Sequence, residues 1–461
     1  MSDVPLMNRR RALQRGVSAA AAAFAVPAFV PGHVFASAGS PGANERIVVG
    51  IVGMGIRGCQ LVYNIPESGR IAAICDADSR KTALAAQELG DHWHVQADYR
   101  KLFDRKDLDA VLICTPHHQH VLPAILACQA GLHVFVEKPL SRYVTEGRAL
   151  VKAARKYGCV VQTGSQARSM EMNRFACEFV RDGGIGRVRV VEAISYGYSR
   201  PYPADGLPEE PVPAGLDWEI WQGPAPQRPY NARLTGYWSA GEDTWRGWLR
   251  SLAGERADWQ DGQWHRTWLG WQDYSGASLA DMGAHAYDMI QYALGADDSG
   301  PVEFWPVGEG GALDSRVDFR YANGVEVRLN RGRHAPGPAT GAVFTGEKCR
   351  IEINRNKFTT NPPDFIRNPP DPALAEKWEQ GTWLARWHIQ NWFDCIQSGE
   401  LPHADVEIGH RTATLCHLIG ITRQLQRRLR WDPQAEQFLG DSEANALLER
   451  PHRKGWELPE L

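Results

Sequence analysis

An apolar run, residues 47–52, ends directly in a glycine-rich turn. A parallel strand that is covered on both faces has such a continuous apolar sequence. In a G-x-G-x-x-G turn the first glycine permits a tight turn, the second lets the main chain approach a pyrophosphate, and the third allows close packing of helix and strand. Free N–H groups at the start of the following helix would face the anion. The turn therefore predicts a Rossmann-type dinucleotide site made by Gly53, Met54, Gly55, Ile56, Arg57 and Gly58.

A carboxylate follows the second predicted strand at the spacing that such a site requires. The strand is the apolar run 71–75, and Asp76 lies 23 residues beyond Gly53. A carboxylate there accepts hydrogen bonds from a ribose diol and repels a 2′-phosphate. Asp76 therefore predicts NAD as the cofactor, and the nearby Arg80 keeps NADP as the less favoured alternative.

Apolar runs continue to alternate with helical patterns through the first part of the chain. The helices after the strands at 110–114 and 134–136 close at Gly131 and Gly158, because glycine readily adopts the left-handed conformation that ends a helix. Such alternation produces right-handed crossovers and an open parallel sheet. We predict an α/β fold that begins with a doubly wound Rossmann domain over residues 44–166.

The pattern changes beyond residue 166. Residues 198–271 are rich in proline, glycine and tryptophan, and a proline-rich loop is expected at 355–376. Alternating segments predict a second, mainly antiparallel open sheet, at 315–321, 324–329 and 349–353. Helices are predicted at 170–181, 281–294, 385–398 and 407–427. Residues 167–461 should therefore form an α+β domain for substrate binding and oligomerisation, in a chain that we expect to be a homo-oligomer.

Polar residues follow two further strands of the parallel sheet. Thr115-Pro116 precedes His117-His118-Gln119-His120, and Glu137-Lys138-Pro139 ends the next strand. Ligands of open parallel sheets bind at the carboxyl ends of the strands. Three close histidines suggest a metal site, but no cysteine or carboxylate stands at a matching spacing, so no metal is predicted. Helix capping is an alternative role for the histidines. We expect the cofactor pocket to be lined by Thr115, Pro116, His118, His120, Glu137 and Lys138.

In this order, the motifs resemble those of the glucose–fructose oxidoreductase/inositol dehydrogenase/MocA family. A later segment, Asp281-Met282-Gly283-Ala284-His285, matches the family's helical Asp-x-Gly-x-His motif. Thr163-Gly164-Ser165-Gln166 and Glu407-Ile408-Gly409-His410-Arg411 are similar to its exported bacterial branch. The resemblance runs from about residue 45 to the C-terminus. It implies a Rossmann fold, a nicotinamide cofactor with Gln166 among its contacts, and a sugar or polyol substrate.

The chain departs from the family pattern at two places. The glycine run that usually precedes the Asp-x-Gly-x-His helix is replaced by Ser275-Gly276-Ala277-Ser278. Where exported relatives carry Asp-His-Trp-His, this chain has His117-His118-Gln119-His120. Both changes bear on the shape of the substrate pocket.

Oxidation of a secondary alcohol needs a base for the hydroxyl proton, a cation beside the developing alkoxide and a hydride acceptor. Histidine has a pKa suited to the first task, and Lys138 can stabilise the charge on the reacting oxygen. Asp281 and His285 are four residues apart on one predicted helix, so the carboxylate can orient the ring or contact the substrate. We predict Lys138, Asp281 and His285 as catalytic residues. The structural alternative is a helix-capping Asp281 and a His285 satisfied in the core.

The N-terminus has the order of segments found in a twin-arginine export signal. Arg9 and Arg10 precede an alanine-rich apolar stretch at 16–30, and Ala36-Ser37-Ala38 offers a cleavage site. None of the nine cysteines belongs to a CxxC pair, which indicates buried free thiols formed in a reducing compartment. A pathway that exports folded proteins reconciles such thiols with the periplasm. We predict a signal peptide over residues 1–38, export by the twin-arginine machinery, periplasmic localisation and no membrane anchor after cleavage.

Composition narrows the class of partner. The formal net charge of −3 gives no reason to expect nucleic acid. Nine of the 17 tryptophans lie between Trp218 and Trp271; most are expected to pack structurally, and one or two to face a sugar. Three functions stay open. They are a dehydrogenase of a sugar, polyol or glycoside with tightly held NAD, a redox-assisted glycosidase, and a sugar-binding protein that retains NAD without catalysis.

Overall fold

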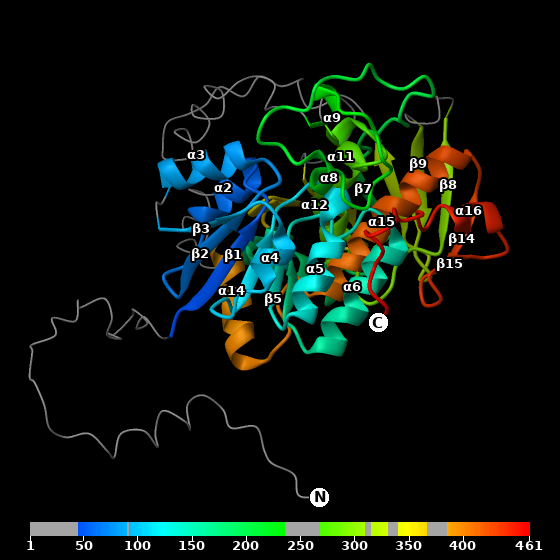
Figure 1. The fold of residues 1–461 in the computed structure, drawn as a ribbon. Coiled ribbons are helices and arrows are strands. Elements are labelled where there is room, and N and C mark those ends of the chain that lie inside the picture. The colour runs from blue at the N-terminus through cyan, green and yellow to red at the C-terminus, as the bar shows by residue number, and fades with distance from the viewer. Residues whose placement is uncertain (1–44, 90–91, 236–267, 309–314, 331–339, 367–384) are drawn as a thin grey trace, which may run out of the picture. The chain divides into compact units, whose positions relative to one another are not determined.

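The computed structural model describes residues 45–89, 92–235, 268–308, 315–330, 340–366 and 385–461. The predicted signal peptide lies outside these ranges. Residues 46–461 form one compact unit that contains two sheets (Figure 1). Within the described ranges, no helix combines the length and the apolar character needed to cross a bilayer. All nine cysteines are free and buried, as predicted.

The first sheet has six parallel strands in the order β3-β2-β1-β4-β5-β6, which is the Rossmann order. Its strands are β1 (Ile47–Val52), β2 (Gly69–Cys75), β3 (His94–Gln96), β4 (Ala110–Ile113), β5 (His133–Val136) and β6 (Val161–Thr163). Its helices are α2 (Ile56–Val62), α3 (Ser79–Leu89), α4 (Tyr99–Phe103), α5 (Val121–Gln129) and α6 (Val144–Tyr157), with short 3-10 turns η2 (His117–Gln119) and η3 (Gln166–Ser169). The predicted doubly wound parallel sheet is therefore confirmed.

The second sheet has nine strands in the order β13-β12-β11-β7-β10-β9-β8-β14-β15, and only the β7–β10 pair is parallel. These strands are β7 (Val190–Ile194), β8 (Glu303–Val307), β9 (Arg316–Arg320), β10 (Glu326–Asn330), β11 (Ala342–Thr345), β12 (Arg350–Asn354), β13 (Lys357–Asn361), β14 (Leu429–Asp432) and β15 (Gln437–Phe438). The mainly antiparallel sheet is confirmed, but the loop predicted at 355–376 is wrong over β13. That strand is an edge strand whose side chains alternate in exposure, and it ends just before Pro362.

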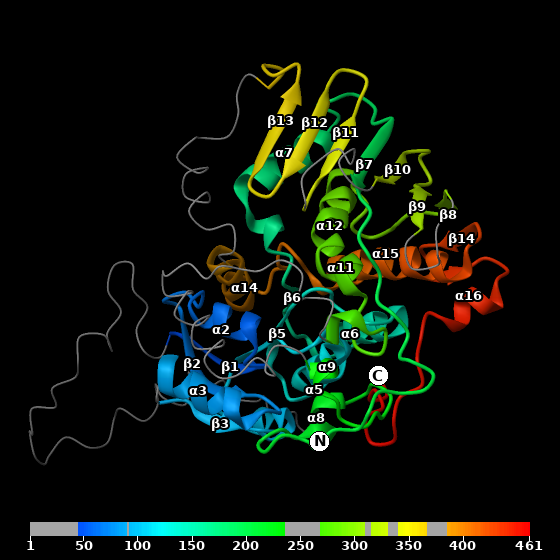
Figure 2. The ribbon, with the colours of Figure 1, turned by 90° about the horizontal axis from the view of Figure 1, so that it is seen from above.

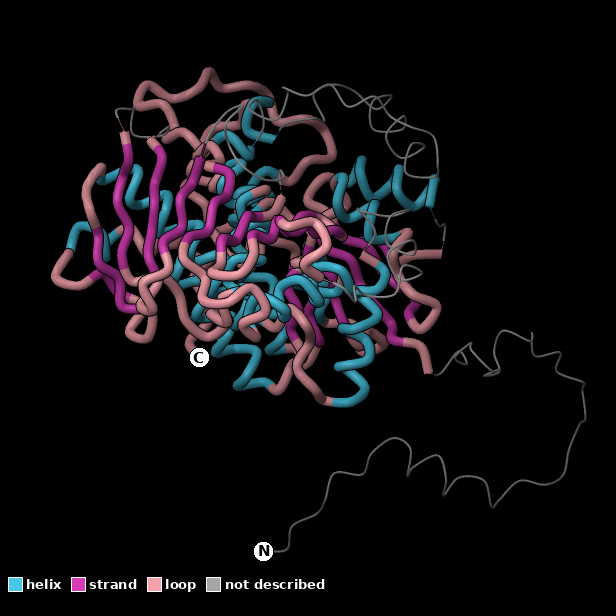
Figure 3. Tube along the Cα trace, turned by 180° about the vertical axis from the view of Figure 1, so that it is seen from behind, coloured by secondary structure: helices cyan, strands magenta, loops and turns pink. Residues whose placement is uncertain are grey.

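Helices of the second half pack on both sheets (Figures 1 and 2). The helices of this half are α7 (Glu171–Arg181), α8 (Trp218–Gln222), α9 (Ala232–Thr235), α11 (Ala277–Asp281), α12 (Gly283–Ala293), α14 (Arg386–Ser398), α15 (Val406–Leu425) and α16 (Ser442–Ala446), with the turn η6 (Trp268–Gly270). The helices α12 and α15 contact the second sheet, and α15 also runs along α6. By contrast, α14 packs on the Rossmann sheet, where the Trp392 Nε1–H donates to the Val160 carbonyl at 3.2 Å. Viewed from behind, the two sheets form separate groups of strands with helices between them (Figure 3).

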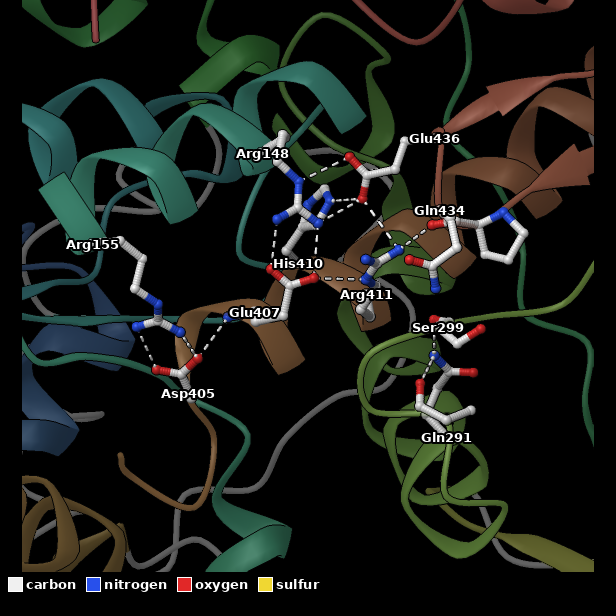
Figure 4. Close-up of polar contacts among 12 residues, drawn as sticks. Arg148, Arg155, Gln291, Ser299, Asp405, Glu407, His410, Arg411, Gln434 and Glu436 are labelled. Carbon is white, nitrogen blue, oxygen red and sulfur yellow. Dashed lines mark hydrogen bonds and ion pairs between the residues drawn. The ribbon is translucent and has the colours of Figure 1, made fainter. Parts of the chain in front are cut away.

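A network of charged side chains joins α6 to α15 (Figure 4). Arg148 on α6 donates to Glu407 at 2.6 Å and to Glu436 at 2.7 Å. His410 on α15 lies 2.6 Å from Glu436, and Arg411 donates to Glu407 at 2.7 Å. Burial alone would raise the pKa of Glu436, but Arg148 and His410 hold that pKa below its usual value. The closing motif around His410 therefore fastens the second half of the chain to a Rossmann helix.

Candidate functional site

In the turn after β1, close contacts with the main chain require glycine at two of the three glycine positions. Gly53 has a positive φ of 93°, and a Cβ there would lie 2.7 Å from the Cys114 main chain. A Cβ on Gly58 would lie 1.9 Å from the Gly53 carbonyl oxygen. Among the residues that the structure describes, none lies within 4 Å of a Cβ placed on Gly55, and none caps α2 through its side chain at the start that follows Gly55. The space beside Gly55 is therefore open to a ligand that approaches the start of α2.

Asp76, at the end of β2, is held against this turn. One carboxylate oxygen accepts a hydrogen bond from the Met54 N–H at 2.8 Å, and the other accepts from the Asp78 N–H at 2.9 Å. Each oxygen keeps a lone pair for a further donor. The guanidinium of Arg80 donates to both oxygens of Asp78, at 2.8 and 2.6 Å. Asp76 is thus fixed where a ribose diol would bind, and Arg80 is engaged with Asp78.

The ends of β5 and β6 supply two further predicted contacts of the cofactor, Glu137 and Gln166. Arg57, in the first turn of α2, donates from Nε to Glu137 at 2.6 Å. A Cβ on Gly164 would lie 2.7 Å from that carboxylate, so the glycine makes room for it. The side-chain oxygen of Gln166 is buried, with no hydrogen-bond partner among the residues that the structure describes. The open space at Gly55, the ribose-ready Asp76 and this unsatisfied acceptor fit a nicotinamide dinucleotide.

Lys138 and Asp281, two predicted catalytic residues, contact each other. The Lys138 ammonium donates to the Asp281 carboxylate, and it also donates to the Asp281 carbonyl oxygen at 3.1 Å. The His285 N–H donates to the Met282 carbonyl oxygen at 3.1 Å. The single helix predicted at 281–294 is divided in the structure into α11, which ends at Asp281, and α12. The Asp281 side chain therefore pairs with Lys138. No hydrogen bond between Asp281 and the His285 ring is found.

His285 lies in the first turn of α12 and is 5% exposed. Burial lowers its pKa well below the usual value, and the nearby cations Lys138, Arg355 and Arg57 lower it further. The ring is therefore neutral at neutral pH, which is the state that can accept a proton. No hydrogen bond to the ring is found within the described ranges.

His118 and His120 are held by main-chain carbonyls. His118 Nε2 lies 3.1 Å from the Trp221 carbonyl oxygen, and its ring packs 4.9 Å from the ring of Tyr274. The two nitrogens of His120 lie 2.7 and 2.8 Å from the carbonyl oxygens of Pro139 and Thr115. Neither ring caps α5, so the capping alternative is wrong. His118 thus joins this segment to α8, and His120 joins the ends of β4 and β5. Their contact with the cofactor stays a prediction.

Thr115 and Pro116 complete the segment between β4 and η2. The Thr115 hydroxyl donates to the Gln119 carbonyl at 2.8 Å, and Pro116 directly precedes η2. In the described part of the chain, no three His, Cys, Asp or Glu side chains are arranged to hold a metal ion.

The two segments that depart from the family pattern, 117–120 and 275–278, contact each other through His117 and Ser275. His117 Nδ1 lies 3.0 Å from the Ser275 hydroxyl, although the residues are 158 positions apart. The Trp268 ring meets His117 edge-on, with ring centroids 4.8 Å apart. His117, Ser275 and Trp268 were not predicted as site residues. The only available signal was that two unrelated segments departed from the pattern together.

The tryptophans divide into packing residues and one candidate for ligand contact. Trp218 stacks on Trp221 at 4.8 Å and donates to the Arg228 carbonyl, and Trp271 donates to the Arg233 carbonyl. Trp268 is only partly buried. Five further tryptophans of the predicted cluster lie outside the described residues, at 238, 245, 248, 259 and 264.

Sequence profiles of one family match both halves of the chain. Residues 47–165 match the oxidoreductase family's NAD-binding Rossmann fold, and residues 242–458 match the C-terminal alpha/beta domain of the same family. The Rossmann match contains the glycine turn, Asp76 and Lys138, and the second match contains Asp281 and His285.

Curated relatives match over a quarter to a third of the chain. A 2,7-anhydro-N-acetylneuraminate hydratase of Mediterraneibacter gnavus is 30% identical over 155 residues, which are 33% of this chain and 40% of the relative. A levoglucosan dehydrogenase of Pseudarthrobacter phenanthrenivorans is 32% identical over 115 residues, 25% of this chain and 29% of the relative. A glycosyl hydrolase family 109 protein of Shewanella sp. is 35% identical over 120 residues, 24% of this chain and 26% of the relative. In each case the match spans less than half of the relative's own length.

Solved structures match over most of the chain and share its fold. An oxidoreductase domain protein of Kribbella flavida aligns with a TM-score of 0.56 and 20% identity, over 86% of this chain and 100% of that one. A scyllo-inositol dehydrogenase of Lactobacillus casei aligns with a TM-score of 0.52 and 17% identity, over 84% and 99%. Both family profiles, the glycine turn and the two-sheet fold agree, and the chain belongs to the Gfo/Idh/MocA family of NAD-binding oxidoreductases.

Proposed function

We propose that this protein oxidises a secondary hydroxyl group of a sugar, polyol or glycoside, with NAD as the hydride acceptor. The observation that carries the proposal is the Lys138–Asp281 pair, which lies beside a buried neutral His285 at the carboxyl end of a Rossmann sheet. These three groups supply a cation, an anion that positions it, and a base.

The chain's own residues have separate tasks in this reaction. Asp281 holds the Lys138 ammonium, which donates to the substrate oxygen and stabilises the negative charge that develops there. His285 accepts the hydroxyl proton on a ring nitrogen, and its burial excludes water from that step. Nicotinamide, when bound beside Gln166, supplies the hydride acceptor.

We propose NAD rather than NADP. Asp76 keeps a negative charge where a 2′-phosphate would lie, and Arg80 is already paired with Asp78. Denaturing the purified protein and identifying the released nucleotide by chromatography tests the choice. Recovery of NADP would overturn it.

The substrate class is supported by the named activities of relatives. Levoglucosan is the substrate named for one of them, and scyllo-inositol is bound in one neighbour of the same fold. Because those matches are partial or distant, the substrate of this chain is a proposal. Its test is to add a panel of sugars, inositols, acyclic polyols and aryl glycosides to the NAD-loaded protein and to record reduced-nicotinamide absorbance. The absence of any spectral change and of any product with all of them would overturn the proposal and favour a non-catalytic sugar-binding protein.

A redox-assisted glycosidase is the second candidate. It is favoured by the Shewanella glycosyl hydrolase relative and by a second buried neutral histidine, His117, whose pKa is lowered by burial and by charges that include Lys138. Oxidation at C3 would acidify the C2 proton, and elimination followed by addition of water would cleave the glycosidic bond. Return of the hydride to C3 would then restore both the hydroxyl group and the oxidised cofactor. A glycosidase releases free sugar from an aryl glycoside with no net reduced nicotinamide, whereas a dehydrogenase accumulates one reduced nicotinamide per substrate oxidised.

We also propose export through the twin-arginine pathway to the periplasm, supported by the order of basic, apolar and small residues before residue 39. Replacing Arg9 and Arg10 together with lysine should leave the precursor in the cytoplasm. Cell fractionation checks this outcome, and normal periplasmic delivery of the double variant would contradict it. The homo-oligomeric state stays a prediction, which light scattering would test.

A further inference from the structure

The contact between His117 and Ser275 sets the tautomer of the histidine. Ser275 is fully buried, and its hydroxyl oxygen accepts a hydrogen bond from the Ala277 N–H at 3.0 Å. Among the described residues, His117 Nδ1, at 3.0 Å, is the acceptor available to the hydroxyl hydrogen. Because Ser275 then donates to Nδ1, the single proton of the neutral ring lies on Nε2. His117 therefore presents an N–H donor in a fixed direction.

This donor has no partner in the described part of the chain. His117 is 4% exposed, and the one hydrogen bond that its ring makes with the described residues is the contact of Nδ1 with Ser275. His118 and His120 differ, because both use their Nε2 atoms to hold main-chain carbonyls. The His117 Nε2 atom is not among the fully enclosed unpaired atoms, which include His118 Nδ1, so a ligand or water can reach it and satisfy the donor.

His117 and Trp268 lie beside the Lys138–Asp281 pair. The His117 ring is 5.7 Å from the ring of His120, which contacts the carbonyl oxygen of Pro139, the residue after Lys138. Trp268 belongs to η6, which packs against α11, and α11 ends at Asp281. Burial lowers the pKa of the His117 ring, and the charge of Lys138 lowers it further, so these two side chains lie near each other.

Trp268 packs against the cluster that contains Trp221 and Trp271, but its indole is less constrained than those of the other described tryptophans of this region. It meets His117 at an interplanar angle of 82°, and such an edge contact does not cover both faces of the indole. No hydrogen bond to its ring nitrogen is found in the described ranges, unlike Trp218 and Trp271. It is also partly exposed, whereas Trp221 and Trp271 are buried.

We propose that His117 and Trp268 bind the ring of a cyclic sugar or cyclic polyol, with Ser275 positioning His117. The inference rests on the proposed oxidoreductase function and names its substrate class. The C–H groups of a pyranose face carry partial positive charge and pack on the electron-rich face of an indole. The His117 Nε2–H donates to a ring hydroxyl, and this neutral donor suits an uncharged ring. An acyclic polyol has no flat C–H face and gains only the hydrogen bond.

Steady-state kinetics of the NAD-loaded protein tests the inference with matched variants. Trp268→Ala and His117→Asn should each raise the KM for the best cyclic substrate about tenfold, the value of one lost contact, and should leave kcat within about threefold. His117→Gln should recover most of the loss, because its amide N–H reaches the position of Nε2 and that of Asn does not. Trp268→Phe should keep an intermediate KM. Trp387→Ala, an exposed tryptophan on α14, is the control and should behave like wild type.

Two further readouts separate binding from a structural role. Trp268→Ala should reduce the preference for cyclic over acyclic substrates, measured as the ratio of kcat/KM values. Ring 15N signals should place the His117 proton on Nε2, and Ser275→Ala should shift that proton population toward Nδ1. If wild type oxidises a cyclic substrate and the His117 and Trp268 variants keep its KM and its preference, the inference is wrong and the proposed function stands. If wild type neither binds nor oxidises any member of the panel, the proposed function fails first and the inference fails with it.

Discussion

The site has two regions: a nucleotide end, formed by the glycine turn and Asp76, and a substrate end, formed by the pairs Lys138–Asp281 and His117–Ser275. Main-chain contacts fix the nucleotide end, and side-chain contacts fix the substrate end. At the nucleotide end, two glycines are required by main-chain approach, and Asp76 is held by two backbone N–H groups. At the substrate end, Lys138 pairs with Asp281 and His117 with Ser275, through side-chain atoms that come from segments more than 140 positions apart. The first end needs only a local turn, whereas the second needs the two halves of the chain to be docked.

This difference shows where function can vary without loss of the fold. A change in the glycine turn alters backbone conformation and therefore the packing of α2 on the sheet. A change at His117 or Ser275 replaces side-chain atoms of two segments that lie outside both sheets. We infer that specificity resides at the substrate end, while cofactor binding is common to chains that keep the nucleotide end. The four predictions below test this division.

The largest effect is expected at the substrate end, from His285→Ala. Loss of the base should reduce kcat by about two to four orders of magnitude. NAD affinity, measured by calorimetry, should stay within about threefold of wild type, because the ring does not contact the glycine turn. Lys138→Ala should also lower kcat and additionally weaken nicotinamide placement. Turnover of His285→Ala at the wild-type rate would place the base elsewhere.

The second prediction concerns the histidines that hold main chain near the nucleotide end. His388 contacts the Thr163 carbonyl oxygen and His417 contacts the Ser141 carbonyl oxygen. Burial lowers the pKa of each to about 3. The unfolded chain therefore binds more protons than the folded chain between about pH 6.5 and pH 3. The stability that these rings contribute is present above pH 6.5 and is lost as the pH falls through that window.

Two such residues together should cost about 3 kcal/mol between pH 6.5 and pH 5, because the slope rises from half of about 1.4 kcal/mol per residue and pH unit at pH 6.5 to nearly the full value at pH 5. Urea denaturation at both pH values measures the loss. His388→Gln removes one titrating group, so its stability should depend less steeply on pH than that of wild type. An equal pH dependence in wild type and variant would show that His388 is not kept neutral by the fold.

A matched pair of glycine variants separates nucleotide binding from folding. Gly58→Ala forces a Cβ to within 1.9 Å of the Gly53 carbonyl oxygen, so the free energy of unfolding should fall by about 1–3 kcal/mol or more. Gly55→Ala has room for its Cβ and an ordinary φ of −76°, so the fold should be kept. Its methyl group fills the space beside the start of α2, and NAD affinity should fall at least about tenfold. Calorimetry and thermal denaturation measure the two effects, and a Gly55→Ala protein that binds NAD normally would contradict the assignment of that space.

The division also explains how much could be predicted from sequence. The glycine turn, Asp76 and the strand ends are read from local periodicity, because each depends on neighbours within one βα unit. The pairing of Lys138 with Asp281 was missed, since the choice between an i,i+4 partner and a partner from a distant strand is made only by docking. The same holds for His117 and Ser275. The strand β13 was missed because an edge strand buries few side chains and has weak alternation.

The smallest expected effect lies at the start of α11, where the substrate end has one strained main-chain position. Ala277 has a positive φ of 51°, a conformation that costs an L-residue roughly 1–2 kcal/mol. Ala277→Gly removes that strain but gives the unfolded chain more freedom, worth about 0.4–1 kcal/mol. The net result should be a stabilisation of about 0.5–1 kcal/mol, seen as a small rise in Tm. Ala280→Gly, three residues later in the same helix, has no strain to relieve and should destabilise by about 0.5–1 kcal/mol.

If both variants destabilise equally, Ala277 is not strained. If Ala277→Gly instead raises the KM for substrate, the Ala277 N–H that fixes Ser275 contributes to the pocket, and the main chain has a larger part at the substrate end than this division allows.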